Sequence, residues 1–321
     1  MTLAEEIKVV RKGTALYDAS AHGHFRIEGP DAAAFLQRIV TNEVTTLPVG
    51  EGRHNALLDR KGMVLSLFFL YRLAPDRFHL ITPPQLTEKT IALFKKMKVI
   101  EKLTIMDVSK EWELVQILNA PSPDRLITFP PKADPPLAER GGFQWEDNFY
   151  KVPIRNIVLP KGSSLDIGQV LSVAYPGCPM SRLDPFPVIS KAAFDLIRME
   201  SGIPEYGVDI DETHLLLEAK LPHCYKRQKG CYPGQEVIER ILAYGKGRTP
   251  HALASLYMEG ERIIASRTEI VTADHLRAGI VTSALFDPLE QKTILLAYLE
   301  SKYLSLPQRP FQIGEDVVRL F

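Results

Sequence analysis

Hydrophobic and polar positions change their spacing several times along the first 245 residues. Period-two alternation is typical of half-buried strands, and apolar residues three and four apart are typical of helices. On this basis we predict strands at 24–28, 55–58, 63–73, 77–81 and 113–118, and helices at 31–39, 86–98, 188–200 and 234–242. We expect Asp31 to cap the first of these helices, and Gly62 to supply the positive φ of a hairpin turn at 59–62.

The pattern changes after the segment 245–248, which reads Gly-Lys-Gly-Arg. Short, closely spaced strands are predicted from there on, at 252–257, 261–265, 268–271, 278–286, 293–298 and 316–320. This spacing favours a small antiparallel β-barrel. We therefore predict a boundary near residue 247, with an N-terminal domain at 1–247 and a C-terminal barrel domain at 248–321. Proline-rich stretches at 121–136 and 174–187 predict irregular segments.

Charge and composition exclude some classes of protein. Lys plus Arg and Asp plus Glu each number 39, so the chain has no surplus of cations for neutralising nucleic-acid phosphates. The longest apolar stretch, 63–71, is far shorter than the roughly 20 residues of a membrane span, and we expect neither a membrane segment nor a signal peptide. An odd, low number of cysteines favours a reducing compartment, so we expect a cytoplasmic protein. These cysteines are Cys178, Cys224 and Cys231.

The segment 229–236, Lys-Gly-Cys-Tyr-Pro-Gly-Gln-Glu, is the most unusual in the chain. Its glycines and proline fix a tight backbone path, and Lys229 can stabilise a thiolate at Cys231 by Coulomb attraction. The alternative interpretation, that Cys231 is a small buried hydrophobe in a shaped loop, stays equally open from the residues alone. Cys224 and Cys231 do not have a usual zinc spacing, so no metal site is predicted, and we interpret the histidines as structural or surface groups.

Several segments together resemble one known family, the YgfZ-type folate-binding proteins. The segment 229–236 resembles the family signature K-G-C-[YF]-x-G-Q-E. The segment 196–204 resembles its R-x-E-x-G-[IL]-P motif, 35–42 resembles its F-L-x-x-x-x-T-N helix end, which closes on Asn42, and 279–283 resembles its G-x-V-T-S strand. The hairpin turn 58–62 also resembles the family's D-x-K-G turn, so the resemblance covers nearly the whole chain.

This resemblance implies an α+β fold, that of the glycine-cleavage T-protein. Two intertwined α+β subdomains and the C-terminal antiparallel barrel would form a three-part ring around a central channel for tetrahydrofolate. Glu200 matches the T-protein glutamate that grips the pterin, and a carboxylate suits the aminopyrimidine edge. The other implied folate-binding residues are Arg198, Gln235, Arg240 and Asn42. For Arg198 and Arg240, the simpler interpretation is a solvated surface arginine.

One departure bears on activity. The T-protein carries its transfer carboxylate in an Asp-Asp pair shortly after the hairpin glycine, whereas Gly62 here is followed by Met-Val-Leu-Ser-Leu-Phe. The general acid or base expected there is missing, so glycine-cleavage transfer is not expected and the chain is not assigned as an enzyme.

The resemblance implies a tetrahydrofolate-binding accessory protein that supports assembly or repair of iron–sulfur enzymes. Its partners would be folate and iron–sulfur client or assembly proteins. In this hypothesis Cys231 acts as a thiolate beside folate, activated by Lys229. Two alternatives stay open: a folate-dependent aminomethyl or methyl transferase or demethylase, and a scaffold that has lost folate binding.

Overall fold

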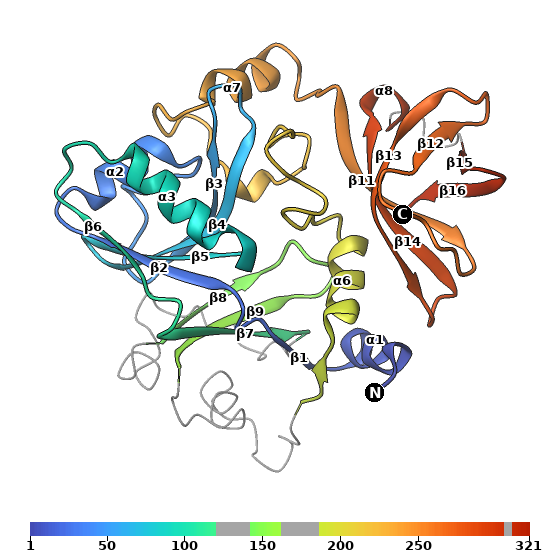
Figure 1. Ribbon diagram of the computed structural model, residues 1–321, viewed down its shortest axis with the longest axis horizontal. Coiled ribbons are helices and arrows are strands. Elements are labelled where there is room, and N and C mark those ends of the chain that lie inside the picture. Colours follow the sequence, from blue (N-terminus) through green and yellow to red (C-terminus); the bar gives the residue numbers. More distant parts are fainter. Residues whose placement is uncertain (120–141, 162–185, 305–309) are drawn as a thin grey trace.

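Within the part of the chain that the structure describes, the strands form two five-stranded sheets and a closed six-stranded barrel (Figure 1). The computed structural model describes residues 1–119, 142–161, 186–304 and 310–321. The expected irregular segment at 121–136, most of the one at 174–187, and Cys178 lie outside these residues.

The first sheet is antiparallel and has the order β3-β4-β5-β2-β6. Helices α2 (Ala32–Ile39) and α3 (Thr87–Met97) cover one face, where Phe25, Phe35 and Phe94 join one buried cluster. Burial of these aromatic side chains and of the aliphatic residues of the cluster stabilises this layer. The strands are β2 (Gly23–Glu28), β3 (Gly52–Leu58), β4 (Val64–Ala74), β5 (Arg77–Thr82) and β6 (Thr104–Asp107).

The second sheet has the order β10-β1-β7-β9-β8, and only its β1–β10 pair is parallel. It packs against the free face of the first sheet, where Tyr71 stacks on Phe143 with ring centroids 4.2 Å apart and Phe69 joins the same buried cluster. The strands are β1 (Ala15–Asp18), β7 (Trp112–Leu118), β8 (Phe143–Asp147), β9 (Ile154–Pro160) and β10 (Val188–Ile189).

The C-terminal strands form the closed barrel, in the order β11-β14-β13-β12-β15-β16, and pairing of β16 with β11 closes it. Closure removes the unpaired sheet edges that an open sheet would leave. The strands are β11 (His251–Glu259), β12 (Glu269–Thr272), β13 (Arg277–Asp287), β14 (Lys292–Glu300), β15 (Phe311–Ile313) and β16 (Asp316–Leu320). A short helix, α8 (Ser301–Leu304), follows β14.

Helix α6 (Lys191–Glu200) lies between the two-sheet body and the barrel, next to α1 (Leu3–Lys12) (Figure 1). Ser190 caps α6 by accepting a hydrogen bond from the backbone of Ala193 at 3.3 Å. Leu196 and Met199 of α6 share a buried cluster with barrel residues such as Leu296. The remaining helical segments are η1 (Pro84–Leu86), η3 (Pro222–Cys224) and α7 (Gln235–Ala243).

Most of the expected elements are confirmed, including the α+β class, the C-terminal antiparallel barrel, and the hairpin turn that ends on Gly62 with φ +81. The strand expected at 261–265 is wrong, because Gly260 turns the chain at φ +76 and Ile263 is fully exposed. Asp31 makes no capping bond, since its carboxylate accepts from the backbone of Lys102 at 2.7 Å instead. The hydrophobic pattern did not predict helices α1 and α8 or strands β1, β6, β8, β9, β10 and β15, so it gave only β7 of the second sheet. In the described ranges, no helix is long and apolar enough to cross a membrane.

Candidate functional site

A cavity of about 170 Å³ lies where the two sheets meet the segment that precedes α7. Its size is below the roughly 300–1,000 Å³ of sites for drug-sized ligands, so it suits one ring system of a larger molecule. We call it the central pocket, and the lining residues used below are His54, Phe69, Gln116, Trp145, Asp147, Phe149, Asn156, His223 and Cys224.

Flat rings form much of the wall of the central pocket. Trp145 stacks on Phe69 with ring centroids 3.9 Å apart and an interplanar angle of 10°. Phe149 stacks on His223 at 3.8 Å and 5°, and His54 meets Phe149 edge-on at 5.1 Å. Because offset-stacked and edge-on geometries are favourable for aromatic groups, these walls can hold a planar heteroaromatic ring.

A row of hydrogen-bonded polar side chains crosses the floor of the pocket. Gln116 donates to Asn156 at 2.7 Å, and Asn156 donates to the Asp147 carboxylate at 2.9 Å. The other carboxylate oxygen of Asp147 lies 2.7 Å from Nε2 of His54. Asp147, Asn156 and Gln116 are all buried. Burial strengthens such a network and makes every missing partner costly.

Two polar atoms of this site have no hydrogen-bond partner among the residues that the structure describes. They are Oε1 of Gln116, an acceptor, and Nε1 of Trp145, a donor. A buried polar group normally finds a partner in the protein, in water or in a ligand. Gln116 and Trp145 both line the pocket, so its wall includes an acceptor and a donor that have no partner within the described residues.

Two groups that line the pocket with Asp147, His223 and Cys224, stay uncharged at neutral pH. Burial, reinforced by the neighbouring His54, lowers the pKa of His223 to about 3. Burial also raises the pKa of the Cys224 thiol well above its usual value, so no thiolate forms there. Against these neutral walls, the Asp147 carboxylate is the group that can accept hydrogen bonds from a polar ring edge.

Asn42 contributes to the pocket indirectly, because it does not line it. Its side-chain amide donates to the carbonyl of His54 at 3.1 Å and to the carbonyl of His223 at 3.0 Å. Its backbone N–H donates to the side chain of Asn55 at 2.9 Å. Asn42 thus fixes the two segments that carry the pocket histidines.

A second hollow of about 620 Å³ continues from the central pocket and shares Phe149 and His223 with it. Lys151 and Lys220 line it, and burial lowers the pKa of both ammonium groups. An anionic group bound beside these lysines would stabilise their charged form and so offset the free-energy cost of burying it, since opposite charge favours the protonated amine. We call this hollow the adjoining cavity.

Glu200 lines the adjoining cavity and does not line the central pocket. Its carboxylate is bonded to Arg11 at 2.5 Å, and the same guanidinium contacts Asp287 of the barrel at 2.6 Å. Burial raises the pKa of Glu200 despite the attraction of Arg11. In this arrangement, Glu200 joins α1, α6 and the barrel, and it faces the cavity that shares Phe149 and His223 with the central pocket.

The two arginines expected near folate differ in environment. Arg198 is buried, bonded to Asp209 and Asp195 at 2.7 Å each, so its interpretation as a solvated arginine is wrong. Arg240 is exposed on α7, and neither Arg240 nor Gln235 lines the two hollows.

The segment 229–236 lies outside both hollows. Cys231 is exposed, whereas Lys229 is only 7% exposed. The Lys229 ammonium donates to the carbonyl of Gln37, and the Gln37 amide donates back to the carbonyl of Lys229 at 2.5 Å. Burial lowers the pKa of Lys229 to about 8. The structure thus brings Lys229 to Gln37 and does not bring Cys231 to the pocket.

The pattern analysis missed the residues that build the central pocket. Asp147, Asn156 and His54 come from three strands, and no short motif unites them. The interpretation of all histidines as structural or surface groups also overlooks His223. One usable signal was present: Asn156 is a polar residue inside the apolar strand β9, which is buried at almost every position.

Comparisons with known proteins find similarity to aminomethyltransferases. Residues 1–134 match the family model described as the GCVT N-terminal domain. The aminomethyltransferase of Chlorobium phaeobacteroides is 25% identical over 94% of this chain and 83% of its own length. The aminomethyltransferase of Thermotoga petrophila is 26% identical over 92% of this chain and 81% of its own.

Among solved structures, the glycine cleavage system aminomethyltransferase T from Bartonella henselae matches with a TM-score of 0.77. The match covers 98% of this chain and 87% of that chain, at 19% sequence identity. The T-protein fold predicted from the sequence is therefore confirmed. The comparisons support the wider family, and the YgfZ type stays a prediction.

Proposed function

We propose that the protein binds tetrahydrofolate, with the pterin in the central pocket, and takes part in folate-dependent one-carbon transfer. The observation that carries this proposal is a flat-walled pocket with one buried carboxylate, Asp147, on its floor. The names of the curated relatives, aminomethyltransferases, support the same chemistry.

The polar floor of the pocket fits the edge of a pterin. An aminopyrimidine edge carries neighbouring N–H donors and ring acceptors, and Asp147 accepts while the amides of Gln116 and Asn156 can do both. The unpartnered atoms, Oε1 of Gln116 and Nε1 of Trp145, would then gain partners. The carboxylates of a glutamyl tail would lie in the adjoining cavity near Lys151 and Lys220.

Proton transfer has a candidate pair in the same pocket. Bound tetrahydrofolate would supply the nitrogen that carries the one-carbon unit. The wall from β4 is apolar, with Leu67 and Phe69 at the pocket, which agrees with the missing acid after Gly62. His54, which Asp147 holds at 2.7 Å, can instead take up and release a proton, as general acid–base catalysis requires.

A second candidate function rests on the loop 229–236. Cys231 is exposed and stands outside the pocket, so a protein partner could reach it without displacing folate. This supports the accessory role in iron–sulfur assembly or repair that the YgfZ-type signature suggests, with Cys231 as the reacting thiol and Lys229 as the residue that holds its loop.

Tetrahydrofolate binding is tested by titration into the full chain while tryptophan fluorescence is followed. The chain has only Trp112 and Trp145, and only Trp145 lines the pocket. We expect a saturable change that Trp145→Phe abolishes and Trp112→Phe preserves. A change that survives in Trp145→Phe, or no saturable change, contradicts the proposed site.

The two functions are separated by assaying turnover and iron–sulfur activity side by side. One-carbon transfer predicts tetrahydrofolate-dependent turnover of a glycine-type or methylamine-type donor, lost in Asp147→Asn and retained in Cys231→Ser. The accessory role predicts no turnover, with iron–sulfur enzyme activity and growth under oxidative stress lowered by Cys231→Ser. Turnover that persists in Asp147→Asn excludes the proposed acid–base pair.

A further inference from the structure

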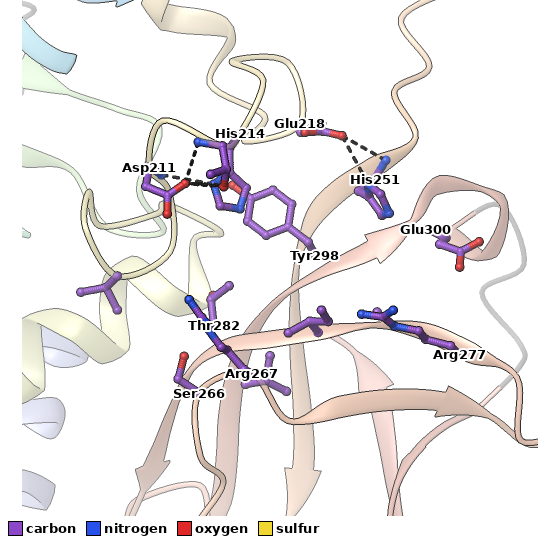
Figure 2. Close-up of a pocket in the computed structure, with 15 residues that line it drawn as sticks. Asp211, His214, Glu218, His251, Ser266, Arg267, Arg277, Thr282, Tyr298 and Glu300 are labelled. Atoms are coloured by element: carbon purple, nitrogen blue, oxygen red, sulfur yellow. Dashed lines mark hydrogen bonds and ion pairs between the residues drawn. The ribbon is translucent and has the colours of Figure 1, made fainter. Parts of the chain in front are cut away.

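A separate cavity of about 630 Å³ lies between the loop 205–218 and the barrel (Figure 2). It shares no lining residue with the central pocket or the adjoining cavity. Figure 2 shows Asp211, His214 and Glu218 on the loop side and Arg267 and Arg277 on the barrel side. The cavity is therefore bounded by charged groups that two distant parts of the chain contribute.

The carboxylates of this cavity already have partners. Asp211 lies 2.7 Å from the ring of His214. Glu218 accepts two backbone N–H groups, at 3.2 and 3.3 Å. Glu300 forms an ion pair with Lys302 at 2.5 Å. Each of these carboxylates thus has a hydrogen-bond or ion-pair partner within the protein.

The two arginines on the barrel side, Arg267 and Arg277, have fewer or weaker partners than the carboxylates. Arg267 makes no side-chain hydrogen bond or ion pair within the ranges that the structure describes. Its backbone N–H donates to Val281 at 2.8 Å, which fixes it at φ +69, a conformation that a non-glycine residue rarely adopts. Arg277 pairs with Glu269 at 2.8 Å, but both side chains are more than half exposed, so this pair contributes little. Both guanidinium groups are thus able to bind an anion.

Tyr298 adds a buried hydroxyl to the wall. The residue is 7% exposed, its ring stacks on His214 at 4.5 Å, and its hydroxyl has no partner among the described residues. Burial raises the pKa of Tyr298, so the hydroxyl keeps its proton and can donate. An unsatisfied buried hydroxyl that lines a hollow indicates a ligand atom or water at that point.

We propose that this cavity binds a small molecule through a phosphate or carboxylate group, which Arg267 and Arg277 neutralise and the Tyr298 hydroxyl hydrogen-bonds. Arginine suits both groups because its planar fork matches their oxygens. The site is independent of folate binding.

Occupancy has a structural consequence for the loop 205–218. The carbonyl of His214 accepts from Val64 at the start of β4, at 3.0 Å. Asp209 of the same loop bonds Arg198 at 2.7 Å and Thr282 of the barrel at 2.5 Å. A bound anion would add a bridge between this loop and the barrel, and would stabilise the folded chain by an amount that rises with the logarithm of its concentration above the dissociation constant.

The test is calorimetric titration and thermal unfolding of the full chain with two probes, inorganic phosphate and glutarate, against sodium chloride at matched ionic strength. We expect saturable binding of at least one probe, and the probe that binds identifies the phosphate or the carboxylate source. Arg267→Gln and Arg277→Gln should each weaken it at least tenfold. Arg262→Gln, which removes another barrel arginine outside the cavity, should leave it unchanged.

Three results overturn the proposal: no binding of either probe beyond chloride, equal loss in Arg262→Gln, or binding that neither cavity arginine affects. A further variant, Tyr298→Phe, tests whether a loss of binding comes from misfolding rather than from the loss of a ligand contact. Because its hydroxyl has no partner in the described part of the protein, the variant should unfold at the wild-type temperature without ligand and bind the probe several-fold more weakly. Unchanged affinity in this variant would also count against the site.

Discussion

The central pocket and the loop 229–236 place reactive groups in opposite surroundings. In the pocket, the Asp147 carboxylate is buried and bonded to His54 and Asn156, under rings stacked less than 4 Å apart. In the loop, Cys231 is exposed and the buried Lys229 is bonded to Gln37 rather than to the sulfur. The pocket encloses its carboxylate between rings, whereas the loop exposes a thiol on a backbone that the Lys229–Gln37 hydrogen bonds hold. Because of this difference, the two regions can have separate roles: the pocket can bind a small molecule, and the loop can react with a protein partner.

The largest expected effect comes from Asp147→Asn. This change keeps the size of the side chain but removes the charge that accepts from His54 and Asn156. We expect one-carbon turnover to fall about 10²- to 10⁴-fold, the usual contribution of a general acid or base. Steady-state kinetics measure this, with the exposed Asp316→Asn as control. Equal turnover in the two variants would show that the Asp147 carboxylate has no catalytic role that a surface carboxylate lacks.

The next largest effect is a dependence of protein stability on pH that comes from Lys229. Its folded pKa, about 8, is lowered by burial, while an unfolded lysine titrates near 10.4. Below about pH 8 the folded state carries the full cost of a buried charge, and that cost disappears as pH rises to about 10.4. The stability of the wild type relative to Lys229→Met should therefore rise across this interval, by up to about 3 kcal/mol.

Urea unfolding at a series of pH values measures that difference. Lys226→Met, which removes an exposed cation from the same loop, is the matched control. If the free energies of unfolding of wild type and Lys229→Met differ by a constant amount from pH 7 to 11, the Lys229 ammonium is not buried. The loop would then lack the buried charged group that the pocket has.

A smaller effect, on tetrahydrofolate affinity, is expected from Phe149→Leu. Phe149 stacks on His223 and lines both the central pocket and the adjoining cavity. Loss of one stacking face should weaken tetrahydrofolate binding about tenfold, since aromatic pairs contribute about 0.5–1.5 kcal/mol beyond their buried area. Calorimetric titration measures the affinity, and Phe286→Leu in the barrel, outside both hollows, should bind like the wild type.

The smallest effect on folate is expected at Cys231. Cys231→Ser should leave tetrahydrofolate affinity within about twofold of wild type, because the thiol does not line the pocket. In a Cys178→Ser background, a thiol reagent should modify Cys231 rapidly and Cys224 slowly. Burial raises the pKa of Cys224, and the thiolate is the reacting form. Rapid modification of both cysteines, followed by mass spectrometry, would contradict this contrast.

By itself, the sequence determined the features that depend on neighbours along the chain. The hairpin turn is one, since Asp59 accepts from the backbone of Lys61 and Met63, at 2.8 and 2.9 Å, within the same few residues. Helix α7 and most barrel strands follow equally from local spacing, and the family motifs led to the T-protein fold that the comparisons confirm.

Only the tertiary structure decided which side chains meet. Asn156 meets Asp147 because β9 pairs with β8 in the second sheet, and His54 of β3 meets Asp147 only because the two sheets pack face to face. The same holds for the burial of Arg198 against Asp209, which no helical pattern reveals. Local spacing fixes the direction of a side chain relative to its own strand or helix, whereas burial, charge pairing and pocket shape depend on segments that are distant in sequence.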